Sequence, residues 1–352
     1  REIGQALGAG TIVTGEIQTS SDKVQVNIQL VNANTEALVW GSTFTKMKDD
    51  FLDLQTEIAT NLASEIKGGL DVKESQQLSQ KATDNPQAFS KYQEGRREWN
   101  KRSKEGFDNA IVCFKDAISL DQDYADPYAG LADTYLLMVN YNHAPQEECL
   151  PLAKKYSHKA LEKNSNLATA YASIAWLQQV FEYNWTAAEE NYKKALKLNP
   201  NYAMGSLWYA MMLRTSHRLD ESLKYFEKAA QLDPNSMIIK AIISGFYEQI
   251  DKKELALKYA NEALEISPYH KSVLRVKYID LQVDGINGAI KKYKDLQKIK
   301  SNDFRSELFK LYLLRGDRDL ALEEFTEIVA GTGVTQNNNY HNYRMFGLYN
   351  NL

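Results

Sequence analysis

One segment of this sequence recurs at a fixed interval of 34 residues. It reads YKKALKLNPN from Tyr192, FEKAAQLDPN from Phe226 and ANEALEISPY from Ala260. Around the first copy, Ala188, Tyr192 and Ala195 are spaced by four and then three residues, so all three lie on one face of a helix. A proline near the end of each copy ends that helix. A period of this length predicts a protein built from repeated helical units.

A second amphipathic segment precedes each copy. In YAGLADTY (128–135), side chains that suit a buried face recur three, four and seven residues after Tyr128, so each unit is expected to be helix, turn, helix. The pattern resembles the tetratricopeptide repeat, which implies a mainly α chain whose six to seven hairpins form a right-handed superhelix. We place the units at 88–124, 125–167, 168–202, 203–236, 237–270, 271–301 and 302–335, with a capping segment at 336–352.

The first 70 residues show a different pattern, in which apolar and polar side chains alternate along several segments. Helices are expected at REIGQAL, at the start, and from Phe51 to about Leu70, so this region is predicted to be a small α-β-β-β-α domain. We expect its first strand to lie upstream of Arg1, in a longer protein. The polar residues 71–87 are expected to be a linker. Three segments are expected to be strands: TIVTGEIQT (11–19), KVQVNIQLV (23–31) and ALVWGSTF (37–44).

Together the two parts resemble a family of bacterial signalling proteins. In that family a small α/β domain, related to the amino-terminal domain of TolB, precedes tetratricopeptide repeats. The resemblance is carried by GTIVTGEIQTSSDKVQVNIQLVNANTEALVW and by EYNWTAAEENYKKALKLNPNYAMGSLWYAMML, and it covers residues 1–300. It implies that a class III nucleotide cyclase, a winged-helix DNA-binding domain or a protein kinase lies upstream.

Composition narrows the classes of partner. The net charge is −4, from 42 basic and 46 acidic residues, which gives no support to a basic face for nucleic acid. Apolar runs such as YLLMV (135–139) are far shorter than the roughly 18 residues of a membrane-spanning helix. We therefore expect neither nucleic-acid binding nor a membrane span in this part of the protein. We place it in the cytoplasm, with the periplasmic part of a membrane-anchored protein as the alternative.

No pattern of residues indicates catalysis. The five histidines lack the spacing of metal ligands, and GAG (8–10) lacks the lysine of a phosphate-binding loop. Cys113 falls on a helical face that is expected to be buried, whereas Cys149 is expected to be more exposed. We expect this part of the protein to be non-enzymatic, without catalytic residues, metal ligands or a cofactor.

The first helix of each unit offers the surface best suited to binding. Stacked helical hairpins present a concave surface lined by these helices. At about 100° per residue, positions 2, 5, 9 and 12 of each unit point away from the buried face. The candidate groove residues at these positions are Trp176, Gln179, Met204, Leu207, Met211, Arg214 and Arg275, and the same positions of one middle unit hold Ile238, Ala241, Gly245 and Glu248. These candidate residues bind a peptide or helix, or they pack against a neighbouring unit. For Trp176 we give the two interpretations about equal weight.

These observations favour an interaction function. We expect a non-catalytic scaffold or regulatory region that binds another protein, a peptide or its own upstream domain, as the carboxy-terminal part of a nucleotide cyclase or a transcriptional regulator. An oligomer is compatible with the sequence. The alternative is a domain that senses a small molecule or pH and controls an upstream output domain.

Overall fold

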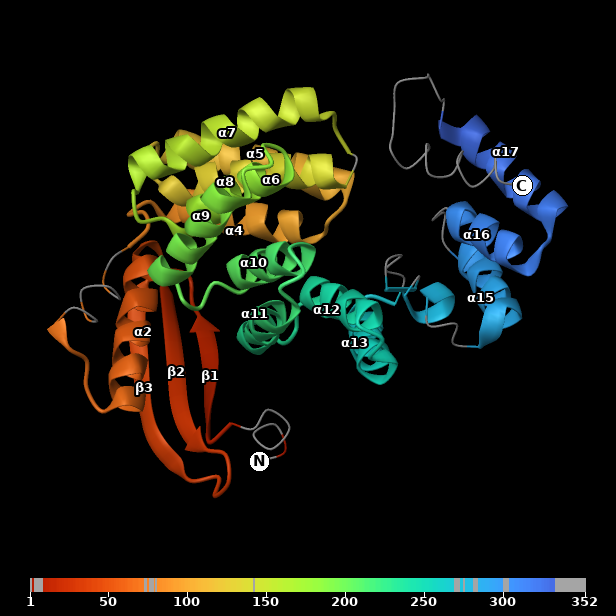
Figure 1. The fold of residues 1–352 in the computed structure, drawn as a ribbon. Coiled ribbons are helices and arrows are strands. Elements are labelled where there is room, and N and C mark those ends of the chain that lie inside the picture. The colour runs from red at the N-terminus through yellow and green to blue at the C-terminus, as the bar shows by residue number, and fades with distance from the viewer. Residues whose placement is uncertain are drawn as a thin grey trace. The chain divides into compact units, whose positions relative to one another are not determined.

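The protein is mainly helical, as predicted, with one small sheet near the amino terminus (Figure 1). The computed structural model describes residues 2, 9–72, 75, 79, 81–141, 143–268, 273, 274, 276–280, 284–299 and 304–332. The chain divides into two compact units, residues 1–200 and 201–352. Among the described helices, none is both long enough and apolar enough to cross a membrane.

The sheet and one helix form a small layered structure in the first unit (Figure 1). The elements are β1 Thr11–Thr19, β2 Lys23–Asn32, β3 Leu38–Met47, the short 3-10 helix η1 Lys48–Asp50 and α2 Phe51–Lys67. The strands are antiparallel in the order β1-β2-β3. Val24, Val26 and Ile28 of β2 alternate inward and pack with Phe44 of β3 and Leu54 of α2. The three predicted strands are confirmed; the helix expected at the start of the chain lies outside the described residues, except for residue 2.

β1 lies at one edge of the sheet. The Ala33 N–H donates to the Gly10 carbonyl at 3.0 Å, which sets the pairing so that even-numbered residues of β1 bond β2. The odd-numbered residues therefore direct their N–H and C=O groups outward, and no strand among the described residues pairs with that edge. Val13 and Ile17 lie on the side of the sheet that α2 covers, yet they are 45% and 69% exposed.

Three helical hairpins complete the first unit. They are formed by α4 Pro86–Asn100 with α5 Lys104–Leu120, α6 Ala125–Asn140 with α7 Gln146–Lys163, and α8 Ala168–Val180 with α9 Trp185–Leu198. α9 begins after Asn184, whose side chain accepts a hydrogen bond from the Ala187 N–H at 3.2 Å. Ala188, Tyr192 and Ala195 are almost completely buried, so the predicted buried face of this helix is confirmed.

The second unit continues with hairpins of the same kind. Its helices are α10 Ala203–Thr215, α11 Leu219–Leu232, α12 Met237–Gln249, α13 Lys253–Ile266, the π-helical segment η2 Val276–Asp280, α15 Gly285–Ile299, α16 Arg305–Arg315 and α17 Arg318–Thr332. Phe226 of α11 packs against Phe246 of α12, with ring centroids 4.9 Å apart, which joins successive hairpins. The capping segment predicted at 336–352 lies outside the described residues.

A residue with left-handed backbone conformation joins the two helices of several hairpins. Tyr183, His217 and Asp251 have φ angles of 54°, 57° and 55° and follow one another at the 34-residue period. Arg102 has a φ of 53°, and Gly316 takes the place in the last hairpin with a φ of 90°. This conformation is unfavourable for residues other than glycine. The hairpins therefore share a turn geometry that their residue types do not reveal, and the sequence analysis missed it.

Candidate functional site

The predicted groove residues of α8 are largely buried. Trp176 is 6% exposed and Gln179 is 9% exposed. The side-chain oxygen of Gln179 accepts a hydrogen bond from the Tyr192 hydroxyl at 3.2 Å, which ties α8 to α9. The structure therefore places both residues in packing positions, and a role in binding stays a prediction for them.

The predicted residues of α10 fall into two groups. Leu207 is fully buried. Met204, Met211 and Arg214 are partly exposed, and their spacing of seven and three residues places them on one face of the helix. These three are the predicted site residues that the structure brings together, while Arg275 lies outside the described residues.

The neighbouring helix α12 presents matching positions. Ile238, Gly245 and Glu248 are partly exposed along one face of α12. Burial lowers the pKa of Arg214, and the Glu248 carboxylate opposes that shift. We define the α10–α12 face as Met204, Met211, Arg214, Ile238, Gly245 and Glu248.

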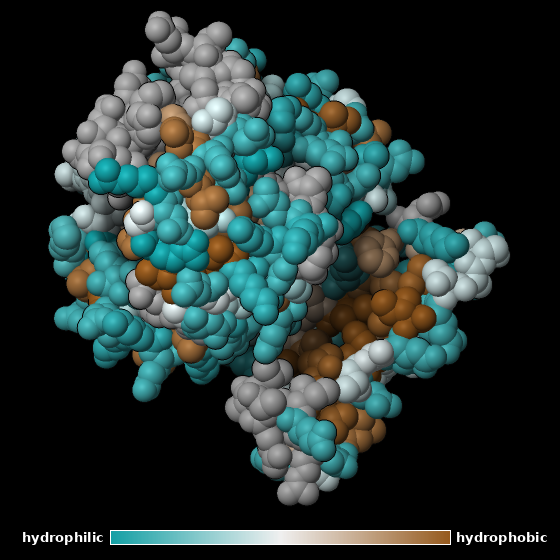
Figure 2. Space-filling model, turned by 90° about the vertical axis from the view of Figure 1, so that its right-hand side faces the viewer, coloured by the Kyte–Doolittle hydropathy of each residue, from teal (hydrophilic) through white to brown (hydrophobic). Residues whose placement is uncertain are grey.

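The chemistry of this face suits recognition. Its methionine side chains are flexible and adapt to irregular apolar partners. At one end Arg214 offers N–H donors and Glu248 offers acceptor oxygens, the groups that a peptide backbone can bond. Most of the surface in Figure 2 is hydrophilic, and the larger group of apolar side chains lies in one region of the view.

A buried polar cluster joins α4, α6 and α8 of the first unit. Asp133 is 1% exposed; its carboxylate accepts a hydrogen bond from the Ser173 hydroxyl at 2.5 Å and lies 3.5 Å from the Arg96 guanidinium. Arg96 and Arg102 both lie over the ring of Trp99, at 4.1 and 3.5 Å from the centroid. The sequence analysis missed this cluster. A signal was present, because Arg96 and Asp133 both occupy position 9 of their repeat units and carry opposite charges.

Burial changes the ionisation of two carboxyl groups in this unit. It raises the pKa of Asp133 to about 6, although the Arg96 charge acts to lower it. Burial likewise raises the pKa of Asp126 to about 6. The pKa of the Tyr192 hydroxyl is also raised by burial. Because both carboxyl groups titrate near neutral pH, the charge inside the first unit depends on pH.

Both cysteines are buried. Cys113 is 7% exposed, as predicted, but Cys149 is 3% exposed, so the expectation of a more exposed thiol is wrong. Cys149 begins the buried face of α7, which continues at Ala153 and Ala160. Burial raises the pKa of both thiols, which disfavours the reactive thiolate. Within the described ranges, no three His, Cys, Asp or Glu residues are grouped as metal ligands would be.

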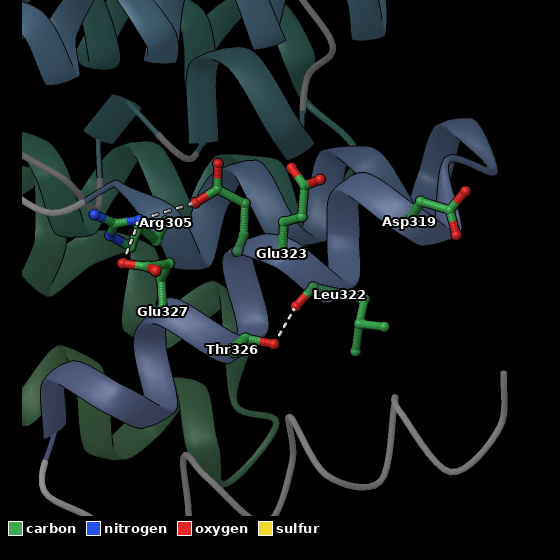
Figure 3. A pocket seen from close by; sticks show the side chains of 7 residues that line it. Arg305, Asp319, Leu322, Glu323, Thr326 and Glu327 are labelled. Carbon is green, nitrogen blue, oxygen red and sulfur yellow. Dashed lines mark hydrogen bonds and ion pairs between the residues drawn. The ribbon is translucent and has the colours of Figure 1, made fainter.

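An acidic hollow of about 650 Å³ lies beside α16 and α17 (Figure 3). Arg305 of α16 forms ion pairs with Glu324 at 3.7 Å and with Glu327 at 3.5 Å. Glu323 and Asp319 line the same hollow, and Asp319 lies at the end opposite Arg305. The hollow is open and its carboxylates are already partly neutralised, so it offers less to a specific ligand than the α10–α12 face.

A second hollow, of about 1000 Å³, lies where α2 meets the start of α4. Lys81 forms ion pairs with Asp53 of α2 and, at 3.5 Å, with Asp84. The Thr83 hydroxyl donates a hydrogen bond to the carboxylate of Asp121, directly after α5. The described end of the predicted linker thus contacts both the sheet-and-helix layer and the first hairpin, so it is an ordered connection at that point.

One repeat is identified directly by comparison with known families. The family model described as tetratricopeptide repeat matches residues 207–236, which cover most of α10 and all of α11. A search of curated proteins finds no match to the chain.

Several solved structures are similar to parts of the chain. YrrB, a TPR protein described as having an unusual peptide-binding site, has 22% identity and a TM-score of 0.34, and the match covers 49% of this chain and 84% of YrrB. PilF of Pseudomonas aeruginosa has 22% identity and a TM-score of 0.41, with 62% and 98% covered. A thermophilic TPR protein of Thermus thermophilus has 16% identity and a TM-score of 0.43, with 55% and 98% covered. The family match therefore identifies residues 207–236 as a tetratricopeptide repeat within a mainly helical chain of similar hairpins.

Proposed function

We propose that this chain is a non-catalytic interaction region that binds a peptide or protein segment on the α10–α12 face. The observation that carries the proposal is the exposure pattern of α10, where Met204, Met211 and Arg214 stay partly exposed while Leu207 is buried. α10 is the first helix of the matched repeat, and first helices line the binding surface of stacked hairpins. Methionine and arginine are also enriched in protein interfaces.

Met211→Ala tests this proposal. Peptides are selected from a random displayed library on the immobilised chain, and the affinity of a selected peptide is measured by fluorescence anisotropy. We expect Met211→Ala to weaken binding about tenfold, because truncation removes a central apolar contact. Leu255→Ala is the matched control: Leu255 is 37% exposed but lies on α13, away from the face. A library that yields no binder, or equal affinity for all three proteins, argues against the proposal.

We further propose that the partner is the output part of a bacterial signalling protein, a nucleotide cyclase or a transcriptional regulator, in the cytoplasm; the alternative location is the periplasm. The support is the resemblance of the sequence to proteins in which a small α/β domain precedes helical repeats. In this chain we propose the α/β domain at residues 1–70, a linker at 71–87, repeats at 88–335 and a capping segment at 336–352. Fusing the chain to such a cyclase and introducing Met211→Ala tests the idea. Unchanged cyclase regulation counts against it.

Asp133 favours a second candidate function, a pH-responsive region. Its carboxyl group is buried near the charged Arg96 of α4 and Arg102 of the following turn, the Ser173 hydroxyl of α8 and the Tyr192 hydroxyl of α9, and its pKa is raised to about 6. Protonation removes the charge that faces Arg96 at 3.5 Å. A change of pH around 6 therefore alters the contacts between α4 and α6 directly.

The pH dependence of stability tests this second candidate. Because the pKa of folded Asp133 lies above its usual 3.8, the folded state holds more protons in this window, and stability falls as pH rises from about 4 to 6. We expect Asp133→Asn, which cannot ionise, to gain about 2 kcal/mol relative to wild type between pH 4 and pH 8 in urea unfolding. Asp123→Asn is the control, since Lys163 lowers the pKa of this exposed carboxyl and the trend has the opposite sign. A pH-independent difference for Asp133→Asn contradicts the idea.

A further inference from the structure

Residues 81–85 connect the sheet-and-helix layer to the first hairpin. They border the hollow of about 1000 Å³ between α2 and the start of α4. The layer has an apolar core of its own, in which Val26 of β2 and Phe44 of β3 pack with Leu54 of α2. Polar contacts hold residues 81–85 on both sides, and the two sides differ in strength.

The side next to the first hairpin is held by hydrogen bonds close to a helix end. Thr83 is 6% exposed, and its hydroxyl donates to the carboxylate of Asp121, directly after α5. The side-chain amide of Asn85 donates to the Leu120 carbonyl at 2.9 Å. The side-chain oxygen of Asn85 also caps α4 by accepting from two N–H groups of its first turn. Because a buried hydroxyl and a helix end depend on these bonds, breaking them destabilises the hairpin.

The side next to α2 depends on exposed charges instead. Lys81 pairs with Asp53 of α2 and with Asp84, and the three side chains are 29%, 51% and 92% exposed. The hydrogen bond from Lys81 lowers the pKa of Asp53 and raises that of Lys81, so both groups are charged at neutral pH. Ion pairs between exposed side chains contribute little to stability and are weakened by salt. The contact with α2 is therefore the weaker of the two.

We propose that residues 81–85 form a latch that holds the sheet-and-helix layer on the first hairpin and opens at the Lys81–Asp53 contact. When this ion pair breaks, Thr83 and Asn85 stay bound to the hairpin while α2 is released. The layer keeps its fold, because its core is built from its own strands and helix. A change on the sheet is passed to the repeats only while the latch is closed. This device controls movement within the first unit and is separate from binding on the α10–α12 face.

Spin labels on both sides of the latch test the proposal. Glu65 of α2 and Lys115 of α5 are exposed, so the full chain is labelled at Glu65→Cys and Lys115→Cys. The native thiols of Cys113 and Cys149 are buried, which protects them from the label. Double electron–electron resonance then measures the distribution of distances between the layer and the hairpin. We expect a narrow distribution at low salt, because a closed latch holds the two labels at one distance.

Two ways of opening the latch should give the same result. We expect Lys81→Met, which keeps the apolar stem but removes the charge, to widen the distribution about twofold, because parts with a weak interface move relative to one another. Salt at about 1 M, where the screening length falls to about 3 Å, should widen it to a similar extent without any substitution. Lys104→Met is the matched control, because Lys104 also pairs with an exposed carboxylate, Asp108 at 2.8 Å, but both residues lie on α5.

Exchanging the two charges gives the most specific check. Lys81→Asp and Asp53→Lys each place like charges at the contact and should widen the distribution, whereas the double variant restores an ion pair and should narrow it again. All variants should melt within about 2 °C of the wild type, which separates opening of the latch from unfolding. Equal widths for the wild type, Lys81→Met and the high-salt sample would overturn the latch. A double variant no narrower than the single ones, or a wide distribution in the wild type at low salt, would overturn it as well.

Discussion

The ring of Phe114 in α5 contacts two glycines on two other helices of the first unit. A Cβ atom at Gly95 of α4 would lie 2.6 Å from the ring, and one at Gly130 of α6 would lie 2.8 Å from it. Both distances are shorter than any real carbon contact, so the two glycines let α4 and α6 approach the ring. The position of one aromatic side chain thus decides two residue types elsewhere in the sequence.

We predict that Gly130→Ala destabilises the chain by about 1 to 3 kcal/mol, because the added methyl group must displace the buried ring. The free energy of urea unfolding measures the change. Phe114→Leu should reduce the penalty in the double variant, since the smaller side chain frees the space, and the double-mutant cycle gives the coupling. A gain in stability with Gly130→Ala would contradict this packing.

At the scale of elements, the turn inside each hairpin repeats a backbone conformation rather than a residue type. His217 and Asp251 occupy the same left-handed position, whereas glycine holds a left-handed position at Gly285, 34 residues after Asp251, and at Gly316. Sequence reasoning predicted the helices on either side because their buried faces recur at helical spacing. It missed the turn because tyrosine, histidine and aspartate share no pattern that announces a positive φ angle.

We predict that His217→Gly stabilises the chain by about 1 kcal/mol, because glycine adopts a φ of 57° without the clash that a Cβ atom causes. Ser216→Gly is the matched control: Ser216 has a φ of −83°, so the substitution there relieves no strain. It adds freedom to the unfolded chain and removes the hydrogen bond from the Ser216 hydroxyl to the Met212 carbonyl at 3.1 Å, so it should be destabilising. Thermal unfolding followed by circular dichroism compares the two. The same melting temperature for both variants would show that the turn stores no strain.

At the scale of the whole molecule, the sequence predicted the order of strands and hairpins but only part of the candidate site. Periodicity identifies the buried face of a helix, and the faces of α9 and β2 were found in this way. It does not tell whether the opposite face is covered by residues distant in sequence. Leu207 and Trp176 stand at positions like those of Met211, yet they are buried. The accessible part of the predicted groove therefore needed the three-dimensional structure.

β1 gives a prediction for the behaviour of the chain in concentrated solution. Its strand lacks lysine and proline, the residues that commonly protect a sheet edge, whereas β3 at the other edge carries Lys46, paired with Glu57 at 3.1 Å. We predict that Ile17→Lys lowers the light scattered by the chain at high concentration, because it places a charge at the apolar edge. Gln18→Lys, on the opposite face, is the control and should change scattering less.

The outer edge of β1, with which no described strand pairs, also affects how the whole chain behaves in solution. A strand with outward-facing hydrogen-bonding groups is a template on which any extended chain can assemble, and it works without regard to the helices that make up most of the molecule. We therefore expect the edge formed by Thr11–Thr19, rather than the stability of the hairpins, to set the onset of turbidity and the yield from refolding of this chain. If Ile17→Lys scatters as much light as the wild type, the hairpins and not this edge set those limits.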